Sequence, residues 1–137
     1  MQILKSTHNL FQLAIADGWQ FSFEDNTYTI FNENELEGVI QISAYVNKNN
    51  NTYNVDHQYK KEILEYPDAI ITQLSKYDSI QYMTKNLEEE ILQLNWVLGH
   101  KQIMLFITLT TDLKYIKSVR KLNQLVCKIF TTLKIIS

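Results

Sequence analysis

The sequence contains one pair of residues in the spacing of a serine acyl-transfer motif. Ser118 and Lys121 form the SxxK pattern of penicillin-binding enzymes, in which one helical turn brings a lysine amine to a serine hydroxyl. The partner motifs of that chemistry, SDN and KTG, do not occur in the sequence. The segment is rich in lysine, so a chance match is easy, and we predict no catalytic role for this pair.

Histidines, cysteine and clustered acids give no catalytic or metal-binding pattern either. His8, His57 and His100 are far apart and show neither HxH nor HExxH spacing. Cys127 is the sole cysteine, and we expect a buried or half-buried, inert thiol. The acidic run 88–90 is expected at the start of a strand, where successive side chains point to opposite faces and cannot converge. We therefore predict no enzymatic activity, no metal site and no cofactor.

The composition is that of an ordinary globular domain. The chain has 137 residues, of which 45% are hydrophobic and 20% charged, so we predict a single domain over residues 1–137. The formal net charge of −2 gives no basic footprint for a nucleic acid. No apolar run approaches the ~20 residues of a membrane span, and the N-terminus does not resemble a signal peptide. We therefore expect a cytoplasmic protein that binds neither nucleic acids nor membranes.

The first third of the chain has the alternating pattern of β-strands. Turn residues stand at Asp17-Gly18 and Asp25-Asn26. Two polar segments, 32–38 and 47–54, are predicted to be loops. The strands are predicted over residues 10–15, 19–24, 27–32 and 39–46.

The pattern changes to a helical period over residues 55–76. Apolar residues recur there at steps of three and four positions, as on one side of a helix. Pro67 disfavours helical angles at Tyr66, so the helix should break near that residue. Because Pro67 suits the first turn of a helix, a second short helix is predicted to begin there.

A strand is expected over residues 79–86, and the chain then forms a hairpin. Gly99-His100 separates two alternating runs, and glycine at the first loop position favours a type II′ turn. This turn predicts that Leu98 pairs with Lys101 and Trp96 with Ile103, which leaves His100 as a solvated turn residue. Under this pairing one face is apolar throughout, with Leu92, Leu94, Trp96, Ile103, Leu105 and Ile107.

Asp112 is predicted to cap a last helix, whose apolar stripe includes Val126 and Ile129. The predicted order is β-β-β-β-α-β-β-β-α, which defines an α+β fold with an antiparallel sheet of about six to seven strands and two helical regions. The predicted buried residues are Trp19, Phe21, Ile40, Ile42, Leu94, Trp96, Leu105, Val126 and Ile129.

The second face of the central strands has a mixed composition. It is too polar for a core, yet it is too rich in aromatic and thioether groups for a purely solvated surface. Such faces suit a protein partner or a small ligand, although partial cover by a helix of the same chain is the favoured explanation. The residues of this mixed face are Gln41, Ser43, Tyr45, Gln93, Asn95, Met104, Phe106 and Thr108.

Four segments together resemble the PsbP-like superfamily. They are "LFQLAIADGWQFSFED", "GVIQISAY", "LNWVLGHKQIMLFITLTTD" and the end "TLKII", which span most of residues 10–136. The superfamily includes a photosystem extrinsic protein, a Ran-binding nuclear protein and many small bacterial domains, and it often has proline where this chain has Ala16. The resemblance implies an α+β fold and a binding role, and it supplies no catalytic residues to carry over.

These observations leave two functional hypotheses. The first is a non-catalytic protein-binding module, such as a chaperone, adaptor or toxin-neutralising partner, which binds another protein or a second copy of itself through the mixed face. The alternative is a small-ligand binding domain that uses the same face. A ligand binder should have a closed concavity of at least ~300 Å³, whereas a partner binder should offer a broader surface.

Overall fold

The computed structural model of this protein describes residues 2–32, 38–47 and 51–136. The predicted loops at 32–38 and 47–54 therefore lie partly outside the described residues, at 33–37 and 48–50. The α-helices are α1 (Val55–Glu65) and α2 (Val119–Ile129), and short 3₁₀ segments lie at Thr7–Asn9 and Leu113–Ser118. The strands are β1 (Gln2–Lys5), β2 (Phe11–Ile15), β3 (Gln20–Glu24), β4 (Thr27–Phe31), β5 (Gly38–Val46), β6 (Ile70–Leu74), β7 (Tyr77–Asn86), β8 (Ile91–His100), β9 (Ile103–Asp112) and β10 (Lys134–Ile135).

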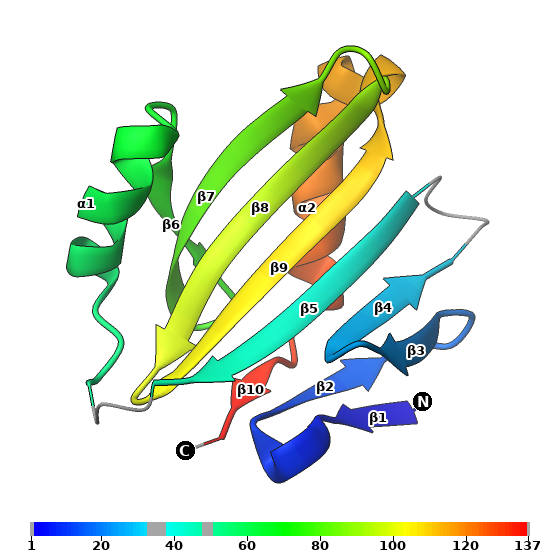
Figure 1. Cartoon of the computed structure of the whole chain (residues 1–137). Coiled ribbons are helices and arrows are strands. Elements are labelled where there is room, and N and C mark those ends of the chain that lie inside the picture. Colours follow the sequence, from blue (N-terminus) through cyan, green and yellow to red (C-terminus); the bar gives the residue numbers. More distant parts are fainter. Residues whose placement is uncertain (1, 33–37, 48–50, 137) are drawn as a thin grey trace.

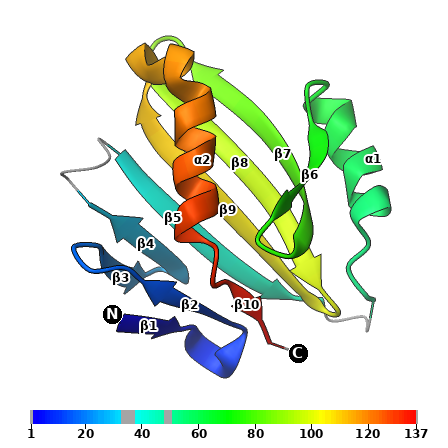
Figure 2. The same ribbon diagram turned by 180° about the vertical axis from the view of Figure 1, so that it is seen from behind.

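The centre of the molecule is a twisted antiparallel sheet (Figure 1). Within the described residues this sheet has seven strands in the order β3-β4-β5-β9-β8-β7-β6, and a small sheet has the order β1-β2-β10. Helix α2 lies across one face of the large sheet, as seen from behind in Figure 2. Helix α1 lies beside β6 and β7 on the opposite face. The α+β class predicted from the sequence is confirmed.

Of the two helical predictions around Pro67, one is confirmed and one is corrected. Helix α1 ends at Glu65, and Tyr66 leaves helical geometry with φ −124° and ψ 84°, so the predicted break is confirmed. The second short helix is wrong, because residues 70–74 form strand β6. This segment contains Ile70, Ile71 and Thr72, whose branched side chains favour a strand. It pairs with β7 through a two-residue turn at Ser75-Lys76.

The predicted register of the late hairpin is also wrong, although its faces are right. The turn lies at Lys101-Gln102, so His100 pairs with Ile103 at the end of the strands and Trp96 pairs with Ile107. Relative to the prediction, each residue of β8 has a partner four positions further along β9. An even shift keeps every side chain on its face. Trp96 and Ile103 therefore both face the core, as expected.

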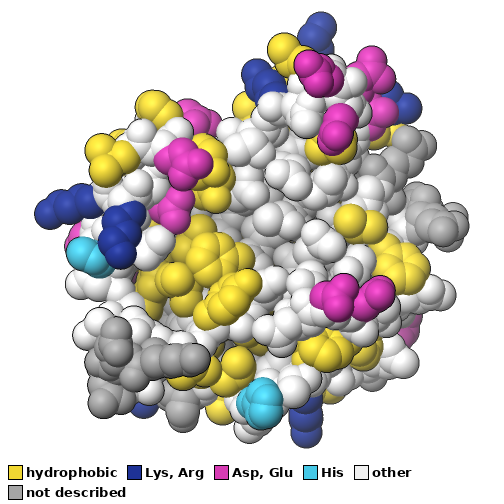
Figure 3. Space-filling view, viewed as in Figure 1, with side chains coloured by type: hydrophobic (Ala, Val, Ile, Leu, Met, Phe, Trp, Pro, Cys, Tyr) yellow, Lys and Arg dark blue, Asp and Glu magenta, His cyan; other side chains and the backbone are white. Residues whose placement is uncertain are grey.

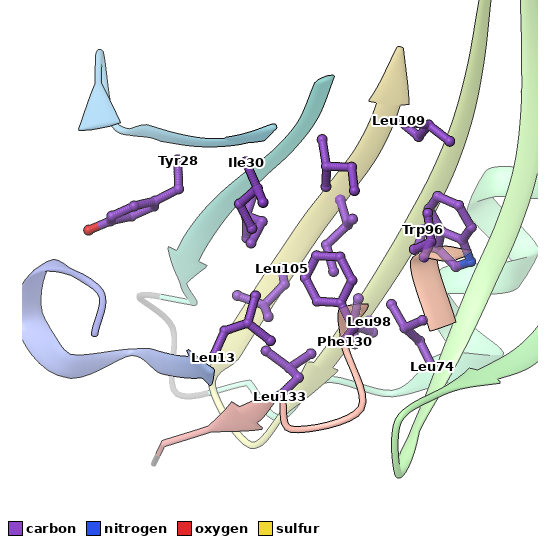
Figure 4. Packing of buried hydrophobic residues seen from close by; sticks show 14 of the residues in the cluster. Leu13, Tyr28, Ile30, Leu74, Trp96, Leu98, Leu105, Leu109, Phe130 and Leu133 are labelled. Carbon is purple, nitrogen blue, oxygen red and sulfur yellow. The ribbon is translucent and has the colours of Figure 1, made fainter. Parts of the chain in front are cut away.

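The core lies between the large sheet, α2 and the small sheet. Of the nine residues predicted to be buried, Trp19, Ile40, Ile42, Leu94, Trp96, Leu105 and Val126 are buried, and Ile129 is partly buried. Phe130, which follows α2, is fully buried in the same cluster. Figure 4 shows Leu13, Leu105 and Phe130 pointing into this interior from three different parts of the chain.

Three further predictions are corrected by the positions of their residues. Phe21 is 38% exposed, because it lies on β3, the end strand of the large sheet. Cys127 is exposed, because it lies one residue beyond Val126 and is thus turned away from the sheet by about 100°. Residues 88–90 lie in the turn between β7 and β8 and not on a strand.

The segment before α2 begins as predicted. The carboxylate of Asp112 accepts a hydrogen bond of 2.8 Å from the backbone N–H of Lys114. This cap starts the 3₁₀ segment Leu113–Ser118, which leads directly into α2. Among the described residues, no helix has the length and apolar character needed to cross a membrane.

Candidate functional site

The eight residues of the mixed face lie together on the side of the sheet opposite α2. They occupy adjacent rows of directly paired residues across β5, β9 and β8. One row pairs Tyr45 with Met104, the next pairs Ser43 with Phe106, and the third joins Gln41, Thr108 and Asn95. Figure 3 shows this face, with hydrophobic side chains beside α1 and a wide, largely uncharged region across the middle.

Helix α1 covers only the margin of this face. Ala69, Ile80 and Val97 are buried there, and Tyr59 and Tyr66 pack against them. Towards β5 the face is open: Gln41 is exposed and Tyr45 is 51% exposed. The mixed composition thus has two structural sources, since one part of the face supports α1 and the other part meets solvent.

The apolar part of the open face is built around two aromatic rings. Tyr45 and Phe106 meet edge to face, with ring centroids 5.4 Å apart and planes at 82°. Phe106 and Met104 are partly buried and pack against the cluster beneath α1. Aromatic pairs in this geometry are favourable beyond the area they bury. The contact therefore restrains the positions of both rings.

The polar part of the face is a ladder of hydrogen-bonded side chains. The amide of Gln93 donates to Thr110 Oγ1 at 3.2 Å, and its oxygen accepts from Thr84 Oγ1 at 3.3 Å. Asn95 is 7% exposed, and its amide lies 3.4 Å from the backbone carbonyl of Tyr82. Asn95 thus has a structural partner, while Gln41 on β5, on the other side of β9, is exposed to solvent.

A groove of about 920 Å³ runs between this face and α1. Tyr45 and Met104 line the sheet side of the groove, and Asn54, His57 and Lys61 line the side towards α1. The chain before α1 is tied to the end of the β8–β9 hairpin, because the N–H of Tyr53 donates to the carbonyl of Lys101. One wall of the groove is therefore the sheet itself, and the chain that leads into the other wall is hydrogen-bonded to the sheet.

Partly buried tyrosines hold α1 against the sheet, and the sequence pattern does not identify them as a group. Tyr53 donates to the carbonyl of Val97 at 3.2 Å, and Tyr66 stacks on Tyr82 with ring centroids 3.9 Å apart. Burial, followed by nearby acidic side chains, raises the pKa of both Tyr53 and Tyr82 above the ordinary value for tyrosine. These phenols stay neutral at physiological pH and act as hydrogen-bond donors.

The space for Tyr53 depends on Gly99. A Cβ built on Gly99 would lie 2.6 Å from Tyr53 Cγ and 2.6 Å from the carbonyl oxygen of Ile103. Gly99 thus permits close packing within β8, a role different from the turn position predicted for it. Tyr53 itself follows a polar, asparagine-rich run, where periodicity carries no signal for a buried anchor.

The candidate chemical groups remain dispersed. Ser118 lies where the 3₁₀ segment passes into α2, and Lys121 is exposed on that helix. His100 is exposed at the end of β8, with its ring centroid 6.2 Å from that of Tyr77. Within the ranges that the structure describes, no three His, Cys, Asp or Glu side chains gather as a metal site would require.

Comparisons with solved structures show the fold. A crystal structure from Bacteroides thetaiotaomicron VPI-5482 matches 98% of this chain and 48% of its own, with a TM-score of 0.73 and 14% identity. This chain therefore spans about half the length of that protein. The solution structure of cyanobacterial PsbP (CyanoP) from Synechocystis sp. PCC 6803 matches 98% of this chain and 92% of its own, with a TM-score of 0.62 and 11% identity.

These matches place the chain in a structural class. It is an α+β protein with a PsbP-like fold, as its sequence resemblance predicted. No protein-family model matches the sequence, and no curated protein matches it. At these identities the likeness concerns the fold alone.

Proposed function

We propose that this protein is a non-catalytic protein-binding module whose docking surface is the open part of the mixed face. The observation that carries the proposal is the pair of Tyr45 and Phe106, fixed edge to face beside a groove and bordered by polar side chains. Protein interfaces combine this kind of aromatic centre with a polar rim. Chaperone, adaptor and toxin-neutralising roles all fit such a surface.

The occupant we propose is a partner protein that places an apolar side chain beside Tyr45. Met104 and Phe106 provide contact area next to it, and Gln41 provides hydrogen bonds at the exposed border. The net charge of −2 gives no support to a nucleic acid as the partner. We also propose that the absence of a convergent acid, base or nucleophile set among the described residues reflects a binding role.

The test begins with a partner captured from the native host and identified. Tyr45→Ala and Phe106→Ala should each weaken its binding at least about tenfold, because a good aromatic anchor contributes roughly 2 kcal/mol or more. Binding is measured by isothermal titration calorimetry, and circular dichroism verifies that each variant is folded. Leu87→Ala is the control, since Leu87 is 75% exposed in the turn after β7 and lies off this face.

Two results would contradict this proposal. One is unchanged partner affinity in both folded aromatic variants, which would move the interface elsewhere. The other is an equal loss in Leu87→Ala, which would show that the effect is not specific to the mixed face.

A small ligand is the second candidate, and the groove favours it. Its volume of about 920 Å³ is ample for a ligand, since sites of this kind begin at about 300 Å³. Native mass spectrometry of the protein purified from its host tests this candidate. A ligand should appear as a defined added mass that Tyr45→Ala loses and Leu87→Ala keeps, whereas a protein partner predicts no such mass.

A further inference from the structure

Strand β3 is an edge strand of the large sheet. It pairs with β4 on one side, while β2, which precedes it, pairs with β1 and β10. All five residues of β3 are exposed, including Phe21 at 38% and Phe23 at 48%. Phe21 and Phe23 lie on the same side of the strand, opposite Ile30 and Tyr28 of β4. An exposed edge strand with two aromatic rings on one face is a site for strand addition.

The hairpin geometry shows which backbone groups of β3 are available. Asp25 and Asn26 form its two-residue turn with φ of 49° and 63°, so Glu24 and Thr27 are the closing, hydrogen-bonded pair. Hydrogen-bonded and non-hydrogen-bonded pairs alternate along an antiparallel ladder. The N–H and C=O groups of Phe21 and Phe23 therefore point away from β4. Three features that commonly protect a sheet edge, namely lysine, proline and a bulge, are absent from "QFSFE", whose charged residue is Glu24.

We propose that β3 pairs antiparallel with β3 of a second copy of this chain, about a two-fold axis through Ser22. In this register Phe21 of one copy lies opposite Phe23 of the other, and their outward groups form four backbone hydrogen bonds. Gln20 lies opposite Glu24 of the other copy, so an amide meets each carboxylate and no like charges are paired. The five-residue strand is thus complementary to itself in backbone, aromatic and charged groups.

The proposed contact is small and should form a weak dimer. Stable interfaces bury about 800 Å² on each partner, more than one five-residue strand provides. The dimer should therefore appear only at high protein concentration. It uses a different part of the molecule from the mixed-face site, so the two proposals can fail independently.

Strand β6, the other edge strand of the large sheet, provides an internal comparison. Strand β6 also exposes apolar side chains, with Ile70 at 55% and Ile71 at 44%. Helix α1 packs beside β6, and Leu74 of that strand is fully buried. Pairing of β6 with itself about Thr72 would place buried Leu74 opposite Ile70, so this strand lacks the complementarity of β3.

Sedimentation equilibrium of the full chain tests the register with charge exchange. In Gln20→Glu, the new carboxylate of each copy lies opposite Glu24 of the other copy, so the dimer contains two pairs of like charges. This variant should raise the dissociation constant of the dimer about fivefold or more. The double variant Gln20→Glu/Glu24→Gln restores one amide opposite each carboxylate and should recover the wild-type constant. Gln73→Glu on β6 should change nothing. These are exposed positions, so folding should be preserved.

A second pair of variants tests the backbone contacts. Phe21→Pro removes an outward N–H that β4 does not use, whereas Phe21→Val removes the same ring and keeps the N–H. Phe21→Pro should therefore dissociate the dimer further than Phe21→Val does. A wild-type chain that stays monomeric up to millimolar concentration would overturn the proposal. So would a dimer that Gln73→Glu weakens, or one that the double variant leaves as weak as Gln20→Glu does.

Discussion

At the level of single residues, Gly99 shows how a missing side chain leaves room for the packing that shapes the groove. Its place in β8 leaves room for the ring of Tyr53, and Tyr53 fixes the chain that enters α1. The groove beside Tyr45 has α1 as one wall. The width of the groove thus depends on a glycine that lines no part of it.

Gly99→Ala should lower the free energy of unfolding by about 1–3 kcal/mol, as overpacking does. The new Cβ would stand 2.6 Å from the carbonyl oxygen of Ile103, which is backbone and cannot rotate away. Urea denaturation measures the cost. The same substitution in a Tyr53→Ala background should cost less, because the ring contact is gone. An identical cost in both backgrounds would show that Tyr53 is not part of the strain.

The partly buried tyrosines beneath α1 predict an alkaline loss of stability. Folding raises the pKa of Tyr53 and Tyr82, chiefly by burial, while the unfolded chain keeps the ordinary value near 10. Above about pH 10 the unfolded state therefore binds fewer protons than the folded state, and stability falls as pH rises. Below that pH the contribution is fully present. Urea denaturation between neutral and alkaline pH should show this fall.

The double variant Tyr53→Phe/Tyr82→Phe provides the control for the alkaline effect. It should be less stable at neutral pH, because the hydrogen bond from Tyr53 to Val97 is lost. Its stability should also decline less steeply above about pH 10, since two of the titrating phenols are gone. An unchanged slope would assign the alkaline loss to other groups.

At the level of elements, the two helices are held very differently. Helix α2 buries Leu122 and Val126 in the main core, whereas α1 has no buried residue. The start of α1 is fixed by Asn54, whose side chain accepts a 2.9 Å hydrogen bond from the N–H of His57. We therefore expect α1 to open locally without unfolding of the sheet.

Amide hydrogen exchange should detect this local opening. The amides of α1 should exchange with a smaller opening free energy than those at the centres of β8 and β9. Asn54→Ala removes the cap and should lower the opening free energy of α1 by about 1 kcal/mol, with the central strands unchanged. Equal protection of α1 and the central strands would show that helix and sheet unfold as one unit.

The elements also show where sequence reasoning reaches its limit. Alternation assigned the faces of β8 and β9 correctly, because a shift by an even number of residues leaves each side chain on its face. For the same reason it could not determine the register, which the turn alone sets. Gly99 suggested the wrong turn, because its role is to accommodate Tyr53, a contact between segments distant in the sequence.

At the scale of the whole molecule, the class of fold was predictable and the helical cover of the mixed face was not. Alternating strands and the apolar side of α2 define an α+β protein from local patterns. The mixed face collects residues from three strands, and its composition did reveal that they lie together. Whether helices cover the face depends on α1, which packs beside β6 and β7, and the sequence pattern predicts a helix in place of β6.

The order of the strands has a consequence for how the chain folds. Strands β6 to β9 follow one another through short turns, so their pairing is local in sequence. The pairing of β5 with β9 instead joins segments far apart in the sequence. So does the pairing of β2 with β10, which lies more than a hundred residues after β2. Pairings between distant segments slow folding, towards milliseconds to seconds for β-rich domains. On the ribosome, β5 would pair only with β4 until β9 has been made, and the small sheet would close last.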